Sequence, residues 1–193
     1  MKKTPTAEII NRCDWCSDDP LYQKYHDEEW GVPTFDDKTL FEFLILEGAQ
    51  AGLSWITVLR KRENYRKAFH QFNPEKIARY SENKIQRLKL DAGIIRNDLK
   101  IRSAVSNAQC YIELCNEKGS LSNYLWNFVE GKPIKNHWQS MKTIPANTTL
   151  SDTISKDLKK RGFKFVGSTI IYAYMQSMGL VNDHLVSCYC YDK

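Results

Sequence analysis

A long segment that is apolar on nearly all sides constrains the fold more than any other feature of the sequence. Between Asp37 and Gly52, apolar residues recur at intervals of three and four, the period of a helix, and form two stripes. A helix with one apolar stripe lies at a surface, whereas a helix that is apolar all round is enclosed by other elements. We therefore expect a buried helix with Asp37 as its N-cap. Gly52 predicts its break, with a new helix from Ser54.

Glu47 is the only charged residue of LILEGAQAGLSW, the most apolar part of this segment. A buried carboxylate is costly unless it is paired or has a function. Aromatic residues lie near the start of the chain and just after the helix: Trp15, Tyr22, Tyr25, Trp30 and Trp55. Aromatic side chains more often belong to a core than to a ligand site. Together with one buried carboxylate, however, they can sandwich a flat base and read its edge.

The rest of the chain also has the pattern of helices, and strand alternation is nearly absent. Helix starts are predicted at Asn73-Pro74, at Ser81, after a turn at Gly93, and at Ser120 or Ser122. Residues 130–149 are polar and contain proline, which indicates a loop. Residues 151–180 indicate two helices joined by a tight turn from Arg161 to Gly167. The predicted fold class is all-α.

Length and composition place the chain among globular proteins. Its 193 residues fit one domain or two small lobes. A composition of 42% hydrophobic and 26% charged residues is ordinary for a globular protein and excludes a disordered one. It contains no apolar run suited to a signal peptide or a membrane span, so we expect a soluble, intracellular protein. The 28 basic and 23 acidic residues leave a net charge of +5, which weakly favours a polyanionic partner.

Cysteine and histidine residues form a set that is divided between the two ends of the chain. Six cysteines in a reducing compartment argue against a disulfide framework. Near the start lie Cys13 and His26; near the end lie His184 and Cys188, whose spacing on a helix would place both on one face. Two thiolates and two imidazoles suit tetrahedral Zn²⁺, and four protein ligands make such a site structural. The alternatives are ordinary buried cysteines, a Cys13-Cys16 ligand or redox pair, and Cys190 in place of Cys188. We expect Cys110 and Cys115 to belong to the core.

The turn in LKKRGFKFVGSTIIY is a candidate phosphate-binding site. Backbone N–H groups at the start of a helix bind anions, and surrounding lysine and arginine add a salt-dependent attraction. The two glycines and Ser168-Thr169 lie where the second helix of the pair begins. The alternative is an ordinary turn between helices with exposed lysines.

Several long strings resemble the bacterial 3-methyladenine DNA glycosylase I family of alkylation-repair enzymes. They are YHDEEWGVP, LEGAQAGLSWITVLRKRENYR, DAGIIRN and KKRGFKFVGSTIIYAYMQSMGLVNDH. The resemblance covers about residues 11–191, so residues 1–10 are expected to be an added tail and residues 11–193 a single domain. The family belongs to the helix-hairpin-helix glycosylases, which implies an all-α fold of two lobes with the base pocket between them.

The resemblance also implies roles for individual residues. One structural zinc would be held by Cys13, His26, His184 and Cys188, which ties the two chain ends together. The base would be recognised by Glu47, Tyr25 and Trp55, with Trp15 at the border of the pocket. Contacts with DNA would come from Gly52 and Leu53 at the gap left by the flipped base, and from the hairpin residues Arg161, Gly162, Lys164, Gly167, Ser168 and Thr169.

The implied activity is hydrolytic release of N3-methyladenine from double-stranded DNA by a monomeric, cytoplasmic bacterial enzyme. The wider superfamily carries an aspartate where this chain has Asn182, although a slip in register could select Asp183. Its lyase-type members carry a lysine where this chain has Thr169. Both departures favour a glycosylase that does not cleave the DNA strand. The competing hypotheses are a non-catalytic, zinc-stabilised binder of damaged DNA and a thiol enzyme that uses Cys13 and Cys16.

Overall fold

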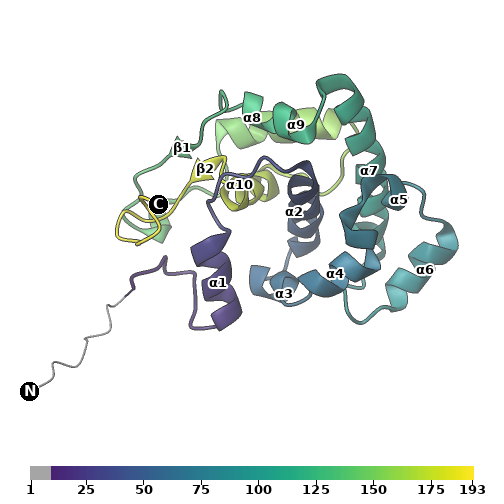
Figure 1. The fold of residues 1–193 in the computed structure, drawn as a ribbon, viewed down its shortest axis with the longest axis horizontal. Coiled ribbons are helices and arrows are strands. Elements are labelled where there is room, and N and C mark those ends of the chain that lie inside the picture. Colours follow the sequence, from purple (N-terminus) through teal and green to yellow (C-terminus); the bar gives the residue numbers. More distant parts are fainter. Residues whose placement is uncertain (1–9) are drawn as a thin grey trace, which may run out of the picture.

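Helices make up most of the chain in the computed structural model, which describes residues 10–193 (Figure 1). The prediction of a helical fold is confirmed, with one small addition. Strands β1 (Ile134–Lys135) and β2 (Val181–Asn182) pair in parallel, with Ile134 opposite Val181. Within the described part of the chain, no helix is long and apolar enough to cross a membrane. The expected tail at residues 1–10 lies outside the described residues, apart from Ile10.

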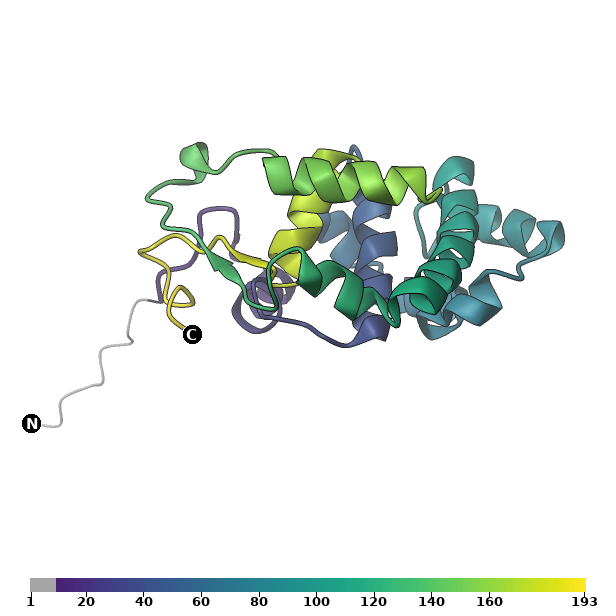
Figure 2. The same ribbon diagram turned by 90° about the horizontal axis from the view of Figure 1, so that it is seen from above.

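The buried helix expected from the apolar segment is α2 (Asp37–Gln50). Every residue from Leu40 to Ala49 is buried. Figures 1 and 2 show why: α1 and α10 lie on one side of α2, and α7, α5 and α6 lie on the other. The helix ends at a turn through Gly52, and α3 (Trp55–Leu59) follows with Ser54 at its N-cap, as predicted.

The N-cap of α2 is Asp36, so the prediction of Asp37 was wrong by one residue. The Asp36 carboxylate accepts a hydrogen bond from the Thr39 N–H at 2.8 Å. The Asp37 carboxylate instead accepts bonds from the N–H groups of Leu121 (3.1 Å) and Ser122 (2.8 Å), and from the Tyr111 hydroxyl (3.1 Å). Asp37 therefore joins α2 to α7 (Asp98–Lys118) and to the start of α8 (Leu121–Asn127).

Most of the other helix starts follow their capping residues. The Asn73 side chain caps α5 (Pro74–Ile77), Ser81 caps α6 (Glu82–Leu90), and Ser120 caps α8, as the sequence predicts. The remaining elements of this region are α4 (Arg62–Ala68) and the short 3₁₀ helix η1 (His70–Phe72). The loop expected at residues 130–149 contains β1 and a second 3₁₀ helix, η2 (Met141–Thr143).

Two local features differ from what the sequence patterns indicated. The aromatic N-terminal segment contains a helix that was not predicted, α1 (Pro20–Glu28). Its signal was present in the sequence, because Asp19 caps the helix and Pro20 occupies its first position. Conversely, His184 and Cys188 do not lie on a helix, since the chain after β2 follows a series of turns.

The predicted helix pair near the end of the chain is confirmed as α9 (Thr149–Lys160) and α10 (Ser168–Ser177), joined by the turn at 161–167. This turn packs directly on α2. A Cβ atom on Gly48 would lie 3.1 Å from the Cβ of Phe165, so the absence of a side chain at Gly48 permits the close approach. Gly162 ends the first helix with a φ of +97°, a conformation that favours glycine.

We expect Asp37→Ala to lower the free energy of unfolding by about 2 kcal/mol, because three donors lose a charged acceptor. Urea denaturation measures the effect. Asp36→Ala is the matched control, and the loss of its helix cap should cost about 1 kcal/mol. An Asp37→Ala effect no larger than that of Asp36→Ala would contradict the assignment.

Candidate functional site

The four predicted metal ligands come together from opposite ends of the chain. Cys13, His26, His184 and Cys188 are all buried, and one ligand atom of each lies within 4.8 Å of the others. The Cys188 Sγ lies 3.5 Å from His26 Nε2 and 3.6 Å from His184 Nδ1, and the Cys13 Sγ lies 3.6 Å from the same His184 atom. This group can hold a metal ion.

The geometry of the group fits a tetrahedral ion. Zinc bonds of about 2.3 Å to sulfur and 2.05 Å to nitrogen place tetrahedral S and N ligands about 3.6 Å apart. The second nitrogen of each imidazole faces an acceptor: His26 Nδ1 lies 2.8 Å from Asp27 Oδ1, and His184 Nε2 lies 3.1 Å from the Trp30 carbonyl oxygen. Each of these nitrogens must therefore carry the proton, which leaves His26 Nε2 and His184 Nδ1 free to bind a metal.

The remaining cysteines stay outside this group of four. Cys16 is half-buried, and its thiol contacts the Ser17 carbonyl oxygen at 3.7 Å. Cys190 is buried and donates its backbone N–H to the Cys188 sulfur at 3.4 Å. Its own sulfur belongs to a second, smaller group with His26 and Asp27. Cys110 and Cys115 lie on α7 and are only half-buried, although we expected both in the core.

Glu47 is buried on α2, with 2% of its surface exposed. The Ser177 hydroxyl, on α10, donates a hydrogen bond to Glu47 Oε1 at 2.6 Å, and the Tyr25 hydroxyl, on α1, donates to Ser177 Oγ at 3.0 Å. Burial raises the pKa of Glu47 to about 7, and the bond from Ser177 opposes that rise. Glu47 Oε2 is buried without a hydrogen-bond partner among the described residues.

Aromatic rings surround this chain of hydrogen bonds. The Tyr25 ring lies 5.5 Å from that of Trp55 and 6.3 Å from that of Trp15, measured between ring centres. The indole N–H groups of Trp15 and Trp55 are also buried without partners in the described chain. Three unsatisfied polar atoms in one cluster are unusual in a folded protein, and a bound polar ligand is one way to satisfy them.

The structure brings the predicted base-recognition residues together beside the metal ligands. Tyr25 and His26 are consecutive on α1, and the Trp15 ring lies 5.2 Å from that of His26. Ser177 is the member that the sequence analysis missed. Its signal was a polar residue at the end of the apolar segment STIIYAYMQS, which resembles the signal that singled out Glu47.

The turn after α2 projects from the surface. Gly52 has a φ of +78° with open space around its Cα, and 42% of the Leu53 surface is exposed. Lys100, at the start of α7, was not anticipated. Its ammonium group donates to the carbonyl oxygens of Ala49 (2.8 Å) and Ala51 (2.7 Å), and so fixes the end of α2.

The α9–α10 turn lies against α2 and offers free backbone donors. No side chain caps α10, so its first N–H groups are available to an anion, and Lys164 and Thr169 are exposed next to them. Arg161 is differently placed. Its guanidinium forms ion pairs with Glu117 (2.6 Å) and Asp157 (2.7 Å), which hold it between α7 and α9.

Asp183 and Asn182 both have structural partners. Asp183 is fully buried, and its two oxygens accept four hydrogen bonds, from Asn136, Trp138, Tyr172 and Gln176. Asn182 accepts a bond from the backbone N–H of His184 and donates one to the Tyr191 carbonyl oxygen. These bonds shape the loop that carries two of the metal ligands.

Comparison with known proteins gives a consistent match. A family model described as methyladenine glycosylase matches residues 15–191. The chain is 53% identical over 182 residues to DNA-3-methyladenine glycosylase 1 of Escherichia coli K12, covering 94% of this chain and 97% of that protein. A crystal structure of 3-methyladenine DNA glycosylase I superposes with a TM-score of 0.91 at 53% identity, covering 93% and 99%. A variant of 3-methyladenine DNA glycosylase I in complex with 3-methyladenine superposes with a TM-score of 0.92 at 37% identity, covering 95% and 99%.

We expect Glu47 to make the stability of the chain fall as the pH rises. Between pH 4.5 and about 7 the folded chain keeps a proton on Glu47 that the unfolded chain has released. The free energy of unfolding therefore decreases across this interval, by on the order of 3 kcal/mol. Glu47→Gln removes this dependence, so the variant should gain stability relative to the wild type between pH 5 and pH 8. Urea denaturation at both pH values measures the difference.

Glu113 is exposed, so Glu113→Gln serves as the control for the loss of one acid elsewhere. The free energy of unfolding of this variant should change with pH as that of the wild type does. Parallel pH curves for Glu47→Gln and the wild type would show that Glu47 titrates normally.

Proposed function

Because the chain belongs to the methyladenine glycosylase family, whose enzymes act on N-glycosyl bonds, we propose that it flips N3-methyladenine out of duplex DNA and releases it by hydrolysis. The observation that carries this proposal is the buried Glu47, which has one oxygen held by Ser177 and the other without a partner among residues 10–193. A carboxylate in that state suits a ligand that is positively charged and has hydrogen-bond donors.

N3-methyladenine in DNA is such a ligand. Methylation leaves the base positively charged within the nucleoside, which weakens the glycosidic bond, and the base departs as a neutral molecule. The enzyme then needs to extrude the base, recognise it and stabilise an oxocarbenium-like sugar. Glu47 would accept hydrogen bonds from the polar edge of the base, and Trp55 would offer a stacking face worth about 0.5–2 kcal/mol of cation–π attraction. We assign Glu47 to recognition rather than to proton transfer.

Ser177 would set the ionisation of Glu47 and its orientation. Its hydroxyl donates to Glu47 while it accepts from Tyr25, so the Tyr25 ring and the carboxylate are held by one atom. Since the bond from Ser177 opposes the effect of burial on the pKa of Glu47, it favours the charged form that pairs with a cationic base.

The Cys2His2 group suits one structural Zn²⁺, since its four protein ligands would leave no open position for catalysis. Bound zinc would supply no step of the reaction, and would hold the segment before α1 against the loop after β2. Cys13 lies two residues before Trp15, and His26 directly follows Tyr25. The ion would therefore fix the wall of the base pocket.

DNA would be held by the turn after α2 and by the helix-hairpin-helix formed by α9 and α10. Gly52 and Leu53 project where they can enter the gap left by a flipped base. The free N–H groups at the start of α10, with Lys164, Ser168 and Thr169, would bind a backbone phosphate. Arg161 is already in ion pairs with α7 and α9, so it would hold the turn in place, together with Gly162, without contacting the phosphate.

The proposed reaction stops at base release. Thr169 offers no amine for the covalent chemistry of strand cleavage, and Asn182 no carboxylate. Asp183 does not replace them, because its oxygens are saturated by internal donors. In this proposal the protein is a cytoplasmic monomer that acts on double-stranded DNA. The alternative is a non-catalytic binder of damaged DNA with the same pocket.

We expect the wild-type chain to release free N3-methyladenine from alkylated duplex DNA, with a rate that rises with pH as Glu47 ionises around pH 7. Glu47→Gln loses a charge-assisted hydrogen bond, so release should slow by about 10- to 100-fold. Ser177→Ala removes a bond that lowers the pKa of Glu47, so the midpoint of the profile should move to higher pH. Chromatography of the released base at several pH values measures all three.

The variant Thr143→Ala, at an exposed position in η2, is the control and should leave the profile unchanged. Binding of alkylated DNA with no base released would instead support the non-catalytic alternative.

Metal analysis of the purified chain should find about one zinc per molecule, because the ligand set is complete within the chain. Cys188→Ser should lose the metal and lower the melting temperature, whereas Cys16→Ser should keep both metal and glycosylase activity. A metal-free preparation with an unchanged melting temperature would contradict the zinc site. Activity lost in Cys16→Ser, with the metal retained, would favour the thiol enzyme.

A further inference from the structure

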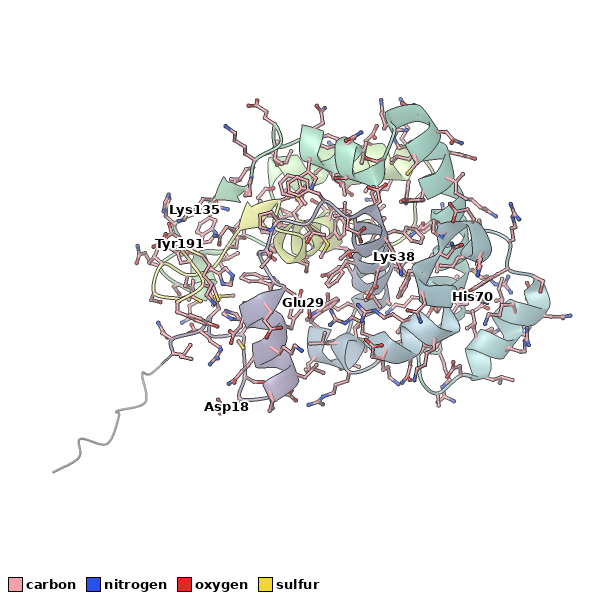
Figure 3. All side chains as sticks on the ribbon, viewed as in Figure 1. Asp18, Glu29, Lys38, His70, Lys135 and Tyr191 are labelled. Atoms are coloured by element: carbon pink, nitrogen blue, oxygen red, sulfur yellow. The ribbon has the colours of Figure 1, made fainter. Side chains whose placement is uncertain are left out.

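A basic hollow of about 380 Å³ lies between α5 and α6, away from the base-recognition residues. Its walls carry four cationic side chains and a histidine–tyrosine pair: Lys76, Arg79, Lys84, Arg87, His70 and Tyr80. We refer to it as the α5–α6 hollow. Figure 3 shows His70 near α6, at the end of the molecule opposite the C-terminus.

The cations of the hollow are not neutralised by acids within the described chain, and the Lys84 ammonium lies 5.4 Å from the centre of the Tyr80 ring. No salt bridge within residues 10–193 involves any of the four. The adjacent basic residues behave differently, because Lys89 pairs with Asp98 and Arg102 pairs with Glu82. The Glu82 carboxylate is thus paired with α7, and the hollow keeps a concentration of positive charge.

The backbone on one wall of the hollow is held in an uncommon conformation. His70, Gln71 and Phe72 have φ values of 51°, 55° and 54°, a left-handed conformation that is unfavourable for residues other than glycine. The buried Phe72 ring and the 2.7 Å contact between His70 Nδ1 and the Tyr80 hydroxyl hold this turn in place. Strain of this kind concentrates at binding sites. Burial, and then the charges of Lys84 and Lys76, lower the pKa of His70.

The hollow is attached rigidly to the turn after α2. Figures 1 and 2 both show α7 between α2 and α6. Lys100 fixes the start of α7 to the end of α2, and the pairs Lys89–Asp98 and Arg102–Glu82 fix α6 to α7. The axes of packed helices lie about 8–10 Å apart. The two steps from α2 to α7 and from α7 to α6 therefore place the hollow roughly 18 Å from the turn after α2. Duplex DNA rises about 3.4 Å per base pair, so that span corresponds to about five base pairs.

We propose that the α5–α6 hollow binds backbone phosphate of the duplex about five base pairs from the damaged base. The inference rests on the proposed function, because it places the damaged base beside Gly52 and Leu53. Exposed arginines present the planar donor groups that match phosphate oxygens, and Lys76 and Lys84 add charge. This second grip would anchor the flank of the duplex while the first turn holds the lesion.

The test compares Arg79→Ala/Arg87→Ala with the wild type on duplexes that carry one tetrahydrofuran abasic-site analogue. One duplex has twelve base pairs on both sides of the analogue. Two others have only three base pairs, on its 5′ side or on its 3′ side. On the long duplex, losing two phosphate contacts should reduce the slope of log affinity against log salt by about 1.8. Between 50 and 200 mM salt, the wild type should therefore lose about 12-fold more affinity than the variant.

The same difference should disappear on one of the two shortened duplexes, the one that no longer reaches the hollow. Lys132→Ala/Lys142→Ala is the control, because it removes two exposed charges at the other end of the molecule. It should bind every duplex with the wild-type salt slope. Base release at saturating alkylated DNA should be normal in both double variants. If the wild type itself released no base, that result would count against the proposed function and not against phosphate binding by the hollow.

An unchanged salt slope on the long duplex in Arg79→Ala/Arg87→Ala would overturn the proposal. The NMR signals of the His70 ring give a readout that is independent of affinity. They should shift when the long duplex is added and stay in place when the duplex too short to reach the hollow is added. A shift with inorganic phosphate alone, and none with the long duplex, would assign the hollow to a free phosphate ligand and would also overturn the proposal.

Discussion

The hydrogen bond from Ser177 to Glu47 joins the two helices on which the rest of the site depends. The two residues are 130 positions apart, on α10 and α2, and the bond lies in the buried interior. It holds a carboxylate that burial alone would drive toward its neutral form. The same hydroxyl accepts from Tyr25, so α1 is joined to this contact as well. Three helices from different parts of the chain thus meet at one oxygen atom.

The four candidate metal ligands lie next to that contact. α1 carries both Tyr25 and His26, so the residue that reaches Ser177 is adjacent to one that can bind the ion. On the other side, the loop with His184 and Cys188 is fixed to α10 through Asp183, whose oxygens accept from Tyr172 and Gln176. The Cys–His group and the residues around Glu47 are therefore parts of one framework rather than two separate features.

Local patterns in the sequence predicted most of the helices but not the contacts between them. The apolar stripes of α2 and the caps at Asn73, Ser81 and Ser120 act within a few residues, and the structure has them as predicted. Asp37 was assigned to the wrong role because its partners lie more than 70 residues away on α7 and α8. The same limitation concealed Ser177 and Lys100, whose importance comes from contacts that no short window contains.

The four candidate metal ligands come together in the structure, although not in the way that their spacing suggested. A helix would have placed His184 and Cys188 on one face, but turns bring them together instead. The donor chemistry of two thiols and two imidazoles left Cys16 and Cys190 as alternatives, and the resemblance to the glycosylase family selected the four. For Arg161, the resemblance implied a contact with DNA, and the structure adds ion pairs with Glu117 and Asp157 that no short window of sequence contains.

The unpartnered oxygen of Glu47 has a consequence for how the pocket, in its proposed role, would discriminate among bases. A neutral adenine turned into the pocket would displace any compensating water and leave a desolvated anion beside an uncharged ring. That arrangement is unfavourable in itself. An undamaged base would therefore lack the favourable contact and would also meet an energetic penalty. Selectivity would then come from an electrostatic penalty against the many ordinary bases, and would not require a cavity shaped to exclude them.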